Sequence, residues 1–128
     1  MSIYDRVGAA LDGWLRDNGF TFYAERALLD RAPAARRMCV AHVISDPDAR
    51  HANNRARVRY YRVQIDILVD EREQAGLYGW FKSAEAALMG TGALPQGNYR
   101  MDFDADSRIA WIHKDYIFKE VLTDGSVR

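Results

Sequence analysis

The sequence predicts a single α+β domain, in which an antiparallel sheet of about four to five strands has two main helices packed on one face. Three observations indicate this class. The chain has 128 residues, the length of one domain. Segments 2–18 and 70–89 show helical spacing of apolar residues, whereas the other apolar segments alternate with polar residues as strands do. The order helix, strands, helix, strands is satisfied by one such layered domain spanning residues 1–128.

The first predicted helix covers residues 2–18. Ser2 can cap its N-terminus, and Asp5 stands where a capping box needs an acceptor. Gly19 is a suitable stop because glycine tolerates the left-handed conformation found there. The apolar stripe consists of Ile3, Val7, Ala10, Leu11, Trp14 and Leu15. Segment 20–23 follows as a short aromatic strand, and segment 24–36 stays ambiguous because Pro33 interrupts any long helix.

A long hairpin is predicted next, with strands 38–45 and 58–69 joined by a polar loop at 48–57. Strict alternation along the second strand predicts one buried face and one wetter face. The face expected to be buried has Tyr61, Val63, Ile65, Ile67 and Val69, and the wetter face has Tyr60, Arg62, Gln64, Asp66 and Leu68.

The second predicted helix covers residues 70–89, with Asp70 as its cap and Gly90 as its stop. Segment 90–98 is predicted to be a loop. Tyr99, Met101 and Phe103 alternate with polar residues as a strand, a turn follows at 104–107, and a final long strand covers 109–122. Segment 99–122 is therefore a second predicted hairpin.

Composition restricts the function. The 18 Lys and Arg residues balance 18 Asp and Glu residues, whereas a dedicated nucleic-acid binder usually has an excess of positive charge. Cys39 is the only cysteine, so neither an internal disulfide nor a CxxC metal half-site can form. The N-terminus lacks the pattern of a signal peptide, and no apolar run approaches the roughly 18 residues of a membrane span. We expect a protein of a cytoplasm, or of a particle assembled there.

Three motifs resemble known sites and fail in detail. Segment 102–107 begins like a calcium loop, but Ser107 replaces the required glycine and His113 the bidentate glutamate. Segment 90–92 resembles a dinucleotide loop, but it follows a helix. Segment 47–48 followed by 64–66 resembles a metal-dependent nuclease, whose second acid precedes a lysine by two residues; Leu68 occupies that position. We therefore predict no metal site and no cofactor.

No catalytic residue is predicted either. His42, His51 and His113 are not spaced as metal ligands, and we expect His42 and His113 to be surface or hydrogen-bonded strand residues. Cys39 is expected to be a small buried side chain. Asp66 could be a functional acid, although a hydrogen-bonded structural or interface residue is the preferred interpretation.

A basic loop between the first two long strands is the strongest candidate site. Arginine and tyrosine are common at protein interfaces, and arginine also binds phosphate, so the loop could contact a partner or be a solvated hairpin tip. A protein partner is our preferred interpretation. The predicted interface residues are Arg50, His51, Asn54, Arg55, Arg57 and Arg59.

In four stretches the sequence resembles the lambda-type tail terminators and related tail-completion proteins of siphophages. These stretches are segment 19–23 after the first helix, the strand 61–68, the helix 71–89 and the closing hairpin 98–122. The likeness covers nearly the whole chain and is one of length, order and pattern, without an invariant signature residue. The basic character of loop 48–59 departs from the family pattern, which leaves the partner of this loop open.

The resemblance implies a structural protein without enzymatic activity. Terminators form a hexameric ring on the last ring of tail-tube protein, stop its polymerisation and present a surface to the head–tail connector. The implied partners are further copies of this chain, the tail-tube protein and the connector, without a membrane or specific nucleic acid. The implied location is the host cytoplasm during assembly and then the virion tail.

Three alternatives remain open at this point. One is another phage neck or minor tail component. A second is a small RNA-binding module, although the acidic start of the helix at 70–73 would repel phosphate. A third is an unrecognised enzyme whose site converges from distant segments, for example around Asp66 and His113.

Overall fold

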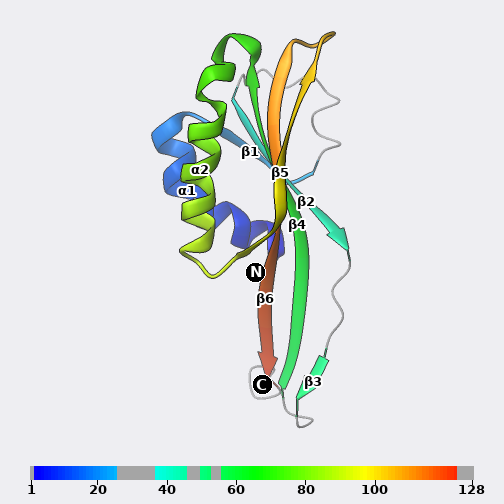
Figure 1. Cartoon of the computed structure of the whole chain (residues 1–128). Helices are drawn as coiled ribbons and strands as arrows, with labels where there is room; N and C mark the ends of the chain where they lie inside the picture. The colour runs from blue at the N-terminus through cyan, green and yellow to red at the C-terminus, as the bar shows by residue number, and fades with distance from the viewer. Residues whose placement is uncertain (1, 26–36, 46–49, 53–55, 124–128) are drawn as a thin grey trace.

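The computed structural model describes residues 2–25, 37–45, 50–52 and 56–123. Two helices pack on one face of a sheet whose strand order is β1-β2-β4-β6-β5, and the short strand β3 pairs with β4 (Figure 1). The predicted α+β class is confirmed. The elements are α1 (Ile3–Asn18), β1 (Thr21–Tyr23), β2 (Met38–Ser45), β3 (Arg50–Ala52), β4 (Ala56–Asp70), the 3₁₀ helix η2 (Glu71–Gly76), α2 (Leu77–Met89), β5 (Leu94–Asp104) and β6 (Ile109–Thr123).

Helix α1 begins and ends as its sequence predicts. The Ser2 hydroxyl accepts a hydrogen bond from the backbone N–H of Asp5 at 3.1 Å, and the Asp5 carboxylate accepts one from the Ser2 N–H at 3.2 Å. Gly19 ends the helix at φ 70°, a left-handed conformation that favours glycine. Both ends of α1 are thus fixed by local chemistry.

The sheet is mixed, because β1 runs parallel to β2 while the other neighbouring pairs are antiparallel. The predicted antiparallel pairing holds for most of the sheet, and the β1 edge departs from it. A parallel pair needs a crossover of a dozen or more residues, and the segment 24–37 between the two strands is long enough to provide it.

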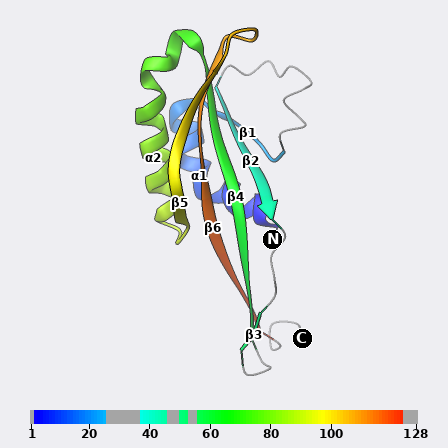
Figure 2. The ribbon, with the colours of Figure 1, turned by 45° about the vertical axis from the view of Figure 1, so that its right-hand side comes forward.

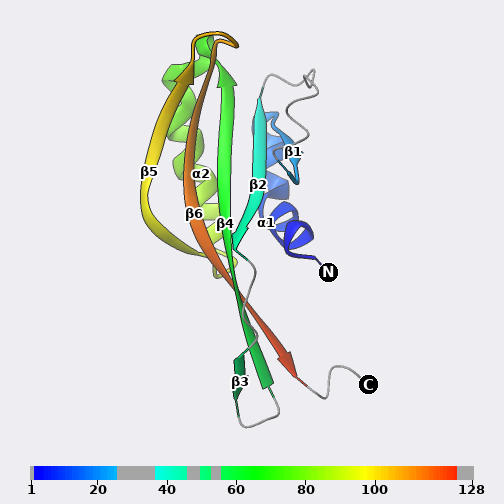
Figure 3. The same ribbon diagram turned by 90° about the vertical axis from the view of Figure 1, so that its right-hand side faces the viewer.

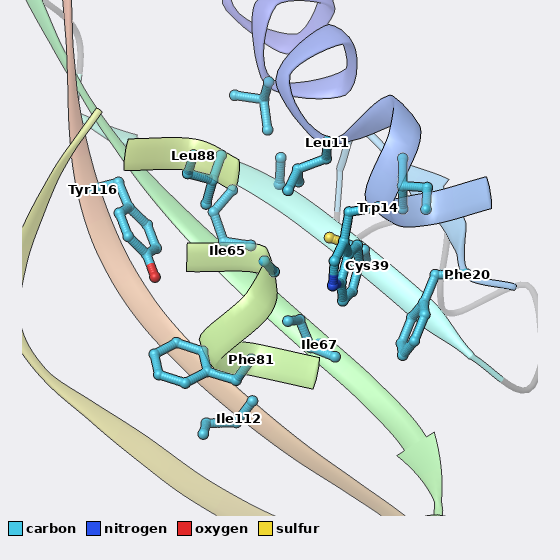
Figure 4. Packing of buried hydrophobic residues seen from close by; sticks show 14 of the residues in the cluster. Leu11, Trp14, Phe20, Cys39, Ile65, Ile67, Phe81, Leu88, Ile112 and Tyr116 are labelled. Atoms are coloured by element: carbon cyan, nitrogen blue, oxygen red, sulfur yellow. The ribbon is translucent and has the colours of Figure 1, made fainter. Parts of the chain in front are cut away.

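The main core lies between the two helices and the sheet. The buried residues Cys39, Ile65 and Ile67 from the sheet meet Leu11 and Leu88 from the helices (Figure 4). Each fully buried aliphatic side chain of this kind contributes roughly 1.5–3 kcal/mol relative to an exposed one. This core holds both helices on the same face of the sheet.

A second, smaller core lies on the opposite face of the sheet. Met38, Val40 and Leu68 are buried there, and Tyr23, Ile109 and Trp111 pack around them. Asp66 on the same face is only 2% exposed. The prediction that this face of β4 is the wetter one is therefore wrong at Asp66 and Leu68 and holds at Tyr60 and Arg62, which are exposed.

Three predicted boundaries also need correction. The helix predicted at 70–89 begins as a 3₁₀ turn over Glu71–Gly76 and becomes α-helical at Leu77, a common arrangement at helix N-termini. The loop predicted at 90–98 is shorter, since β5 already begins at Leu94. Strand β3 lies inside the loop predicted at 48–57, where it pairs with the start of β4.

Strands β4 and β6 pair over fifteen residues, from Ala56 opposite Thr123 to Asp70 opposite Ile109. At about 3.4 Å per residue this ladder is roughly 50 Å long. Its first part, together with β3, projects beyond the helices as a narrow ribbon (Figures 2 and 3). We call the ribbon formed by residues 50–52, 56–60 and 119–123 the arm, and the rest of the described chain the body.

Candidate functional site

The arm contains four of the six predicted interface residues. Arg50 and His51 lie on β3, opposite Val58 and Arg57 of β4, and Arg59 lies opposite Glu120 of β6. Backbone pairing of β3, β4 and β6 therefore brings the basic residues of this stretch together at one end of the molecule. Asn54 and Arg55 lie outside the described residues.

One face of the arm is apolar and accessible. Tyr60 is 44% exposed and Val121 is 55% exposed, and Val58 is half-buried opposite Val121. The exposed Lys119 lies opposite Tyr60 on the same face. Sequence alternation predicted the exposure of Tyr60, but not that Val121 would lie beside it.

The base of the arm is fixed by polar contacts between the two long strands. Arg62 Nε donates to Asp115 Oδ2 at 2.8 Å, and the Tyr61 hydroxyl donates to Glu120 Oε1 at 3.4 Å. Phe118 is buried at the junction with the body. The arm is thus continuous with the sheet and anchored where it leaves the core.

A second accessible apolar surface lies at the opposite end of the molecule, along the edge strand β5. Tyr99, Met101 and Phe103 of β5 are 41–46% exposed, and so is Tyr78 of α2. The Tyr99 ring lies 5.5 Å from the Tyr78 ring and 5.4 Å from the Phe81 ring. Met101 and Phe103 pair with Ile112 and Ala110 of β6, which are buried against the helices. Met101 and Phe103 therefore lie on the helix-facing side of the sheet, but α2 does not cover them. We call Tyr78, Tyr99, Met101 and Phe103 the edge patch.

Acidic residues flank the edge patch. Asp102, Asp104 and Asp106 are all exposed, and Arg100 is the only basic residue of segment 100–106. The Asp102 carboxylate lies 2.9 Å from His113 Nε2. This end of the sheet therefore has an acidic rim, opposite in sign to the arm.

Asp104 has a structural role in the β5–β6 turn. Its carboxylate accepts hydrogen bonds from the Ser107 hydroxyl at 2.8 Å and from the Asp106 N–H at 3.1 Å. These hydrogen bonds, that of Ser107 first, hold the pKa of Asp104 below its ordinary value. The predicted interpretation of segment 102–107 as a hairpin turn agrees with this geometry.

A polar hollow of about 510 Å³ opens where β5 bulges away from β6. The register jumps from Gln96 opposite Asp115 to Arg100 opposite His113, so three residues of β5 face one residue of β6. The hollow is lined mainly by polar and charged side chains. Among these, Arg62 contacts Asp115, His113 contacts Asp102 and Lys114 contacts Glu85.

The residues considered for catalysis lie as follows. Asp66 lies opposite His113 on the neighbouring strand, but His113 is hydrogen-bonded to Asp102, and Asp66 accepts from Gln64 Nε2 at 2.7 Å. His42 Nδ1 lies 3.0 Å from Glu25 Oε2. Cys39 is completely buried, and burial raises the pKa of its thiol far above the ordinary value, so it remains protonated. The expectations for Cys39, His42 and His113 are confirmed.

Sequence reasoning missed a buried polar cluster beneath α2. The Glu85 carboxylate accepts hydrogen bonds from Lys114 Nζ at 2.9 Å and from the Tyr116 hydroxyl at 2.8 Å. Burial alone would raise the pKa of Glu85, but these two hydrogen bonds outweigh it and hold the pKa below 4.5. Burial and the adjacent Glu85 also raise the pKa of Tyr116. The cluster joins α2 to β6 and is a structural feature.

A second missed cluster, centred on Arg37 just before β2, joins α1, η2 and α2. Arg37 lies over the Trp80 ring at 4.5 Å, and its guanidinium donates to Glu73 at 3.1 Å and to the backbone oxygen of Asn18 at 2.7 Å. These three contacts hold the end of α1 against the start of the second helical segment. These contacts join residues that are distant in the sequence, so no local pattern could have predicted the role of Arg37.

In the described part of the chain, no group of three or more His, Cys, Asp and Glu side chains could hold a metal ion. Among the helices in the same residues, none is both long and apolar enough to cross a membrane.

Among the described residues, the arm and the edge patch are two surfaces on which the fold leaves apolar side chains accessible. Comparison with known proteins gave no match: the chain matches no protein-family model, and no curated protein is significantly similar to it.

Proposed function

We propose that this protein is a structural subunit of a bacteriophage tail that closes into a ring on the end of the tail tube. In this role it ends polymerisation of the tube protein and provides the surface to which the head connector binds. The likeness of the sequence to lambda-type tail terminators suggests the role. The projecting arm is the single structural observation that supports it best.

The arm supports an assembly role because a two-stranded ribbon is at best marginally stable by itself in water. Tyr60 and Val121 on its surface are about half exposed in the single chain. Exposed apolar residues beside basic ones are typical of surfaces that a partner covers. A neighbouring subunit or the tube end would cover them in an assembled tail.

The overall charge also fits a protein of which several copies meet. The chain has no net charge at neutral pH, so copies that come together have little electrostatic self-repulsion. The arm and the body are different surfaces, and contacts between different surfaces of identical subunits can close into rings.

The proposal is tested by tube capping. Tail-tube protein of the same phage is polymerised with and without this protein, and tube lengths are measured by negative-stain microscopy. We expect shorter tubes with a ring at one end, and a ring-shaped end density that is lost when Arg55 and Arg57 are both replaced by Glu.

The control for this assay is Leu94→Ser, which changes an exposed residue of β5 outside the arm. This variant should cap tubes as well as the unmodified protein does. Unchanged tube length at a large excess of unmodified protein would reject the terminator role. Binding along the tube wall or to the connector alone would instead identify a different neck or minor tail component.

A further inference from the structure

Two accessible apolar surfaces lie at opposite ends of the molecule. The arm has Tyr60 and Val121 on one face, and the edge patch has Met101 and Phe103 on the edge strand β5. Figure 3 shows the arm projecting at one end of the sheet and β5 running to the other end. Both surfaces lie on long strands of the same sheet, so their separation is set by the roughly 50 Å ladder between β4 and β6. One chain therefore cannot bring its own arm onto its own edge patch.

The edge patch is an uncovered part of the helix-facing side of the sheet. The two helices cover β2, β4 and β6, whereas Met101 and Phe103 on the outer strand remain nearly half exposed. The Tyr99 and Tyr78 rings form one wall of the patch and the edge of β5 forms the other. One further layer of structure would bury this surface, and a narrow apolar element can provide that layer.

The arm has the dimensions and the chemistry of such an element. It is a ribbon of two to three strands, and its accessible apolar residues lie on one face. The arm is also opposite in charge to this end of β5, where Asp102 and Asp104 lie on the other face of the strand from Met101 and Phe103. The arm has four basic residues (Arg50, Arg57, Arg59 and Lys119) and one acidic residue, Glu120. Segment 100–106 has three acidic residues and one basic residue.

We infer that the arm of one copy binds the edge patch of the next copy. Tyr60 and Val121 pack on Met101 and Phe103 in this contact, and Lys119, which shares the face of Tyr60, lies toward the acidic β5–β6 turn. The occupant of the edge patch is thus a second copy of this chain. The inference rests on the proposed ring and specifies which two surfaces form it.

The contact is heterologous, because two different surfaces meet: one copy keeps its edge patch free for a further neighbour, and the other copy keeps its arm free. Repeated contacts of this type close into a ring or extend as an open series, depending on the rotation between neighbours. Opposite charges on the two surfaces favour this pairing over arm-to-arm or edge-to-edge contact, in which like charges would face each other.

Thiol cross-linking tests the inference directly. The native Cys39 is completely buried, so cysteines introduced at the surface react alone. Val121→Cys marks the arm and Met101→Cys marks the edge patch. Each variant is treated with a flexible bismaleimide, which forms one thioether with each of two nearby thiols, separately and as an equal mixture.

We expect the mixture to give a covalent dimer containing one copy of each variant, and either variant alone to give no more product than the unmodified protein. A chain with both substitutions should give a ladder of multimers. Adding Lys119→Glu, on the face of the arm that carries Tyr60 and Val121, should lower the yield about tenfold, a change that corresponds to about 1.4 kcal/mol of binding free energy. Pairing Val121→Cys with Leu94→Cys provides the control without product.

The results separate this inference from the proposed function. No dimer from the mixture, or equal dimer from Val121→Cys alone, would overturn the arm-to-edge contact. If tubes are still capped in that case, the ring forms through other surfaces. If the mixture cross-links but tubes are not capped, the contact is correct and the terminator role is not.

Discussion

The body and the arm of this molecule differ in what stabilises them. In the body, β4 is covered by two helices on one face and partly by a second small core on the other, so Ile67 is 1% exposed. In the arm, the same strand pairs with β3 and β6, and Tyr60 remains 44% exposed. The body is therefore stabilised within one chain, whereas the surface of the arm is suited to contacts between chains.

The largest expected difference is in how much the free energy of unfolding falls when a side chain is truncated to alanine. Ile67→Ala should lower the free energy of unfolding by about 3 kcal/mol, because it leaves a cavity between the sheet and the helices. Tyr60→Ala should lower that of the isolated chain by less than about 1 kcal/mol, since the side chain is already half exposed. Urea unfolding followed by circular dichroism measures both. Equal losses for the two variants would contradict the distinction between body and arm.

The buried cluster beneath α2 gives the next largest effect. Glu85→Gln should destabilise the protein by about 2 kcal/mol near neutral pH, because Lys114 loses its buried partner charge. The pKa of Glu85 is lower in the folded chain than its ordinary 4.5, so its contribution is present above that pH and is lost as the pH falls through the folded value.

The pH dependence gives this prediction a separate measurement. Between about pH 6 and about pH 3 the unmodified protein should lose more stability than Glu85→Gln, which lacks this titrating group. Other carboxylates titrate in both proteins, so the difference between the two curves reports on Glu85. Parallel curves would show that the carboxylate is not held by Lys114 and Tyr116.

A smaller effect is expected at the start of α1. Ser2→Ala removes the hydroxyl that accepts from the Asp5 N–H and should cost about 1 kcal/mol. Ser2→Asp retains an acceptor and should keep most of the stability, so it is the matched control. Thermal unfolding compares the three proteins, and identical midpoints would mean that the capping box has no energetic role.

The smallest expected effect on folding is in the polar loop predicted from the sequence at 48–57. The double variant with Arg55→Glu and Arg57→Glu should unfold within about 0.5 kcal/mol of the unmodified protein, because substitutions in a solvated polar loop seldom change stability more. The same variant should lower the yield of assembled virions strongly. Normal virion yield would remove the basic end of the arm from the proposed interface.

Much of the fold could be predicted from local chemistry. The ends of α1, the bounds of β2 and both hairpins follow from caps, turns and alternation, which are properties of neighbouring residues. The parallel pairing of β1 could not be predicted, since the pattern of a three-residue strand does not specify the direction of its partner. The burial of Asp66 and Leu68 could not be predicted either, because alternation assumes that only one face of a strand is covered.

The candidate site was predicted in part. Arg50, His51, Arg57 and Arg59 were identified from composition, and the structure shows that strand pairing brings them together at the end of the arm. The edge patch had no such signal. Met101 and Phe103 have the alternation of core residues, and only the position of α2 leaves them exposed.

The central claim, that copies of this chain assemble through surfaces outside the body, is tested most directly by molar mass. Light scattering after size exclusion would be measured over a range of protein and salt concentrations, with negative-stain images of the largest species. We expect a ring of about six copies that dissociates as salt rises, and a monomer for the Arg55→Glu, Arg57→Glu variant. A strict monomer at every concentration, or a ring unaffected by that variant, would contradict the account.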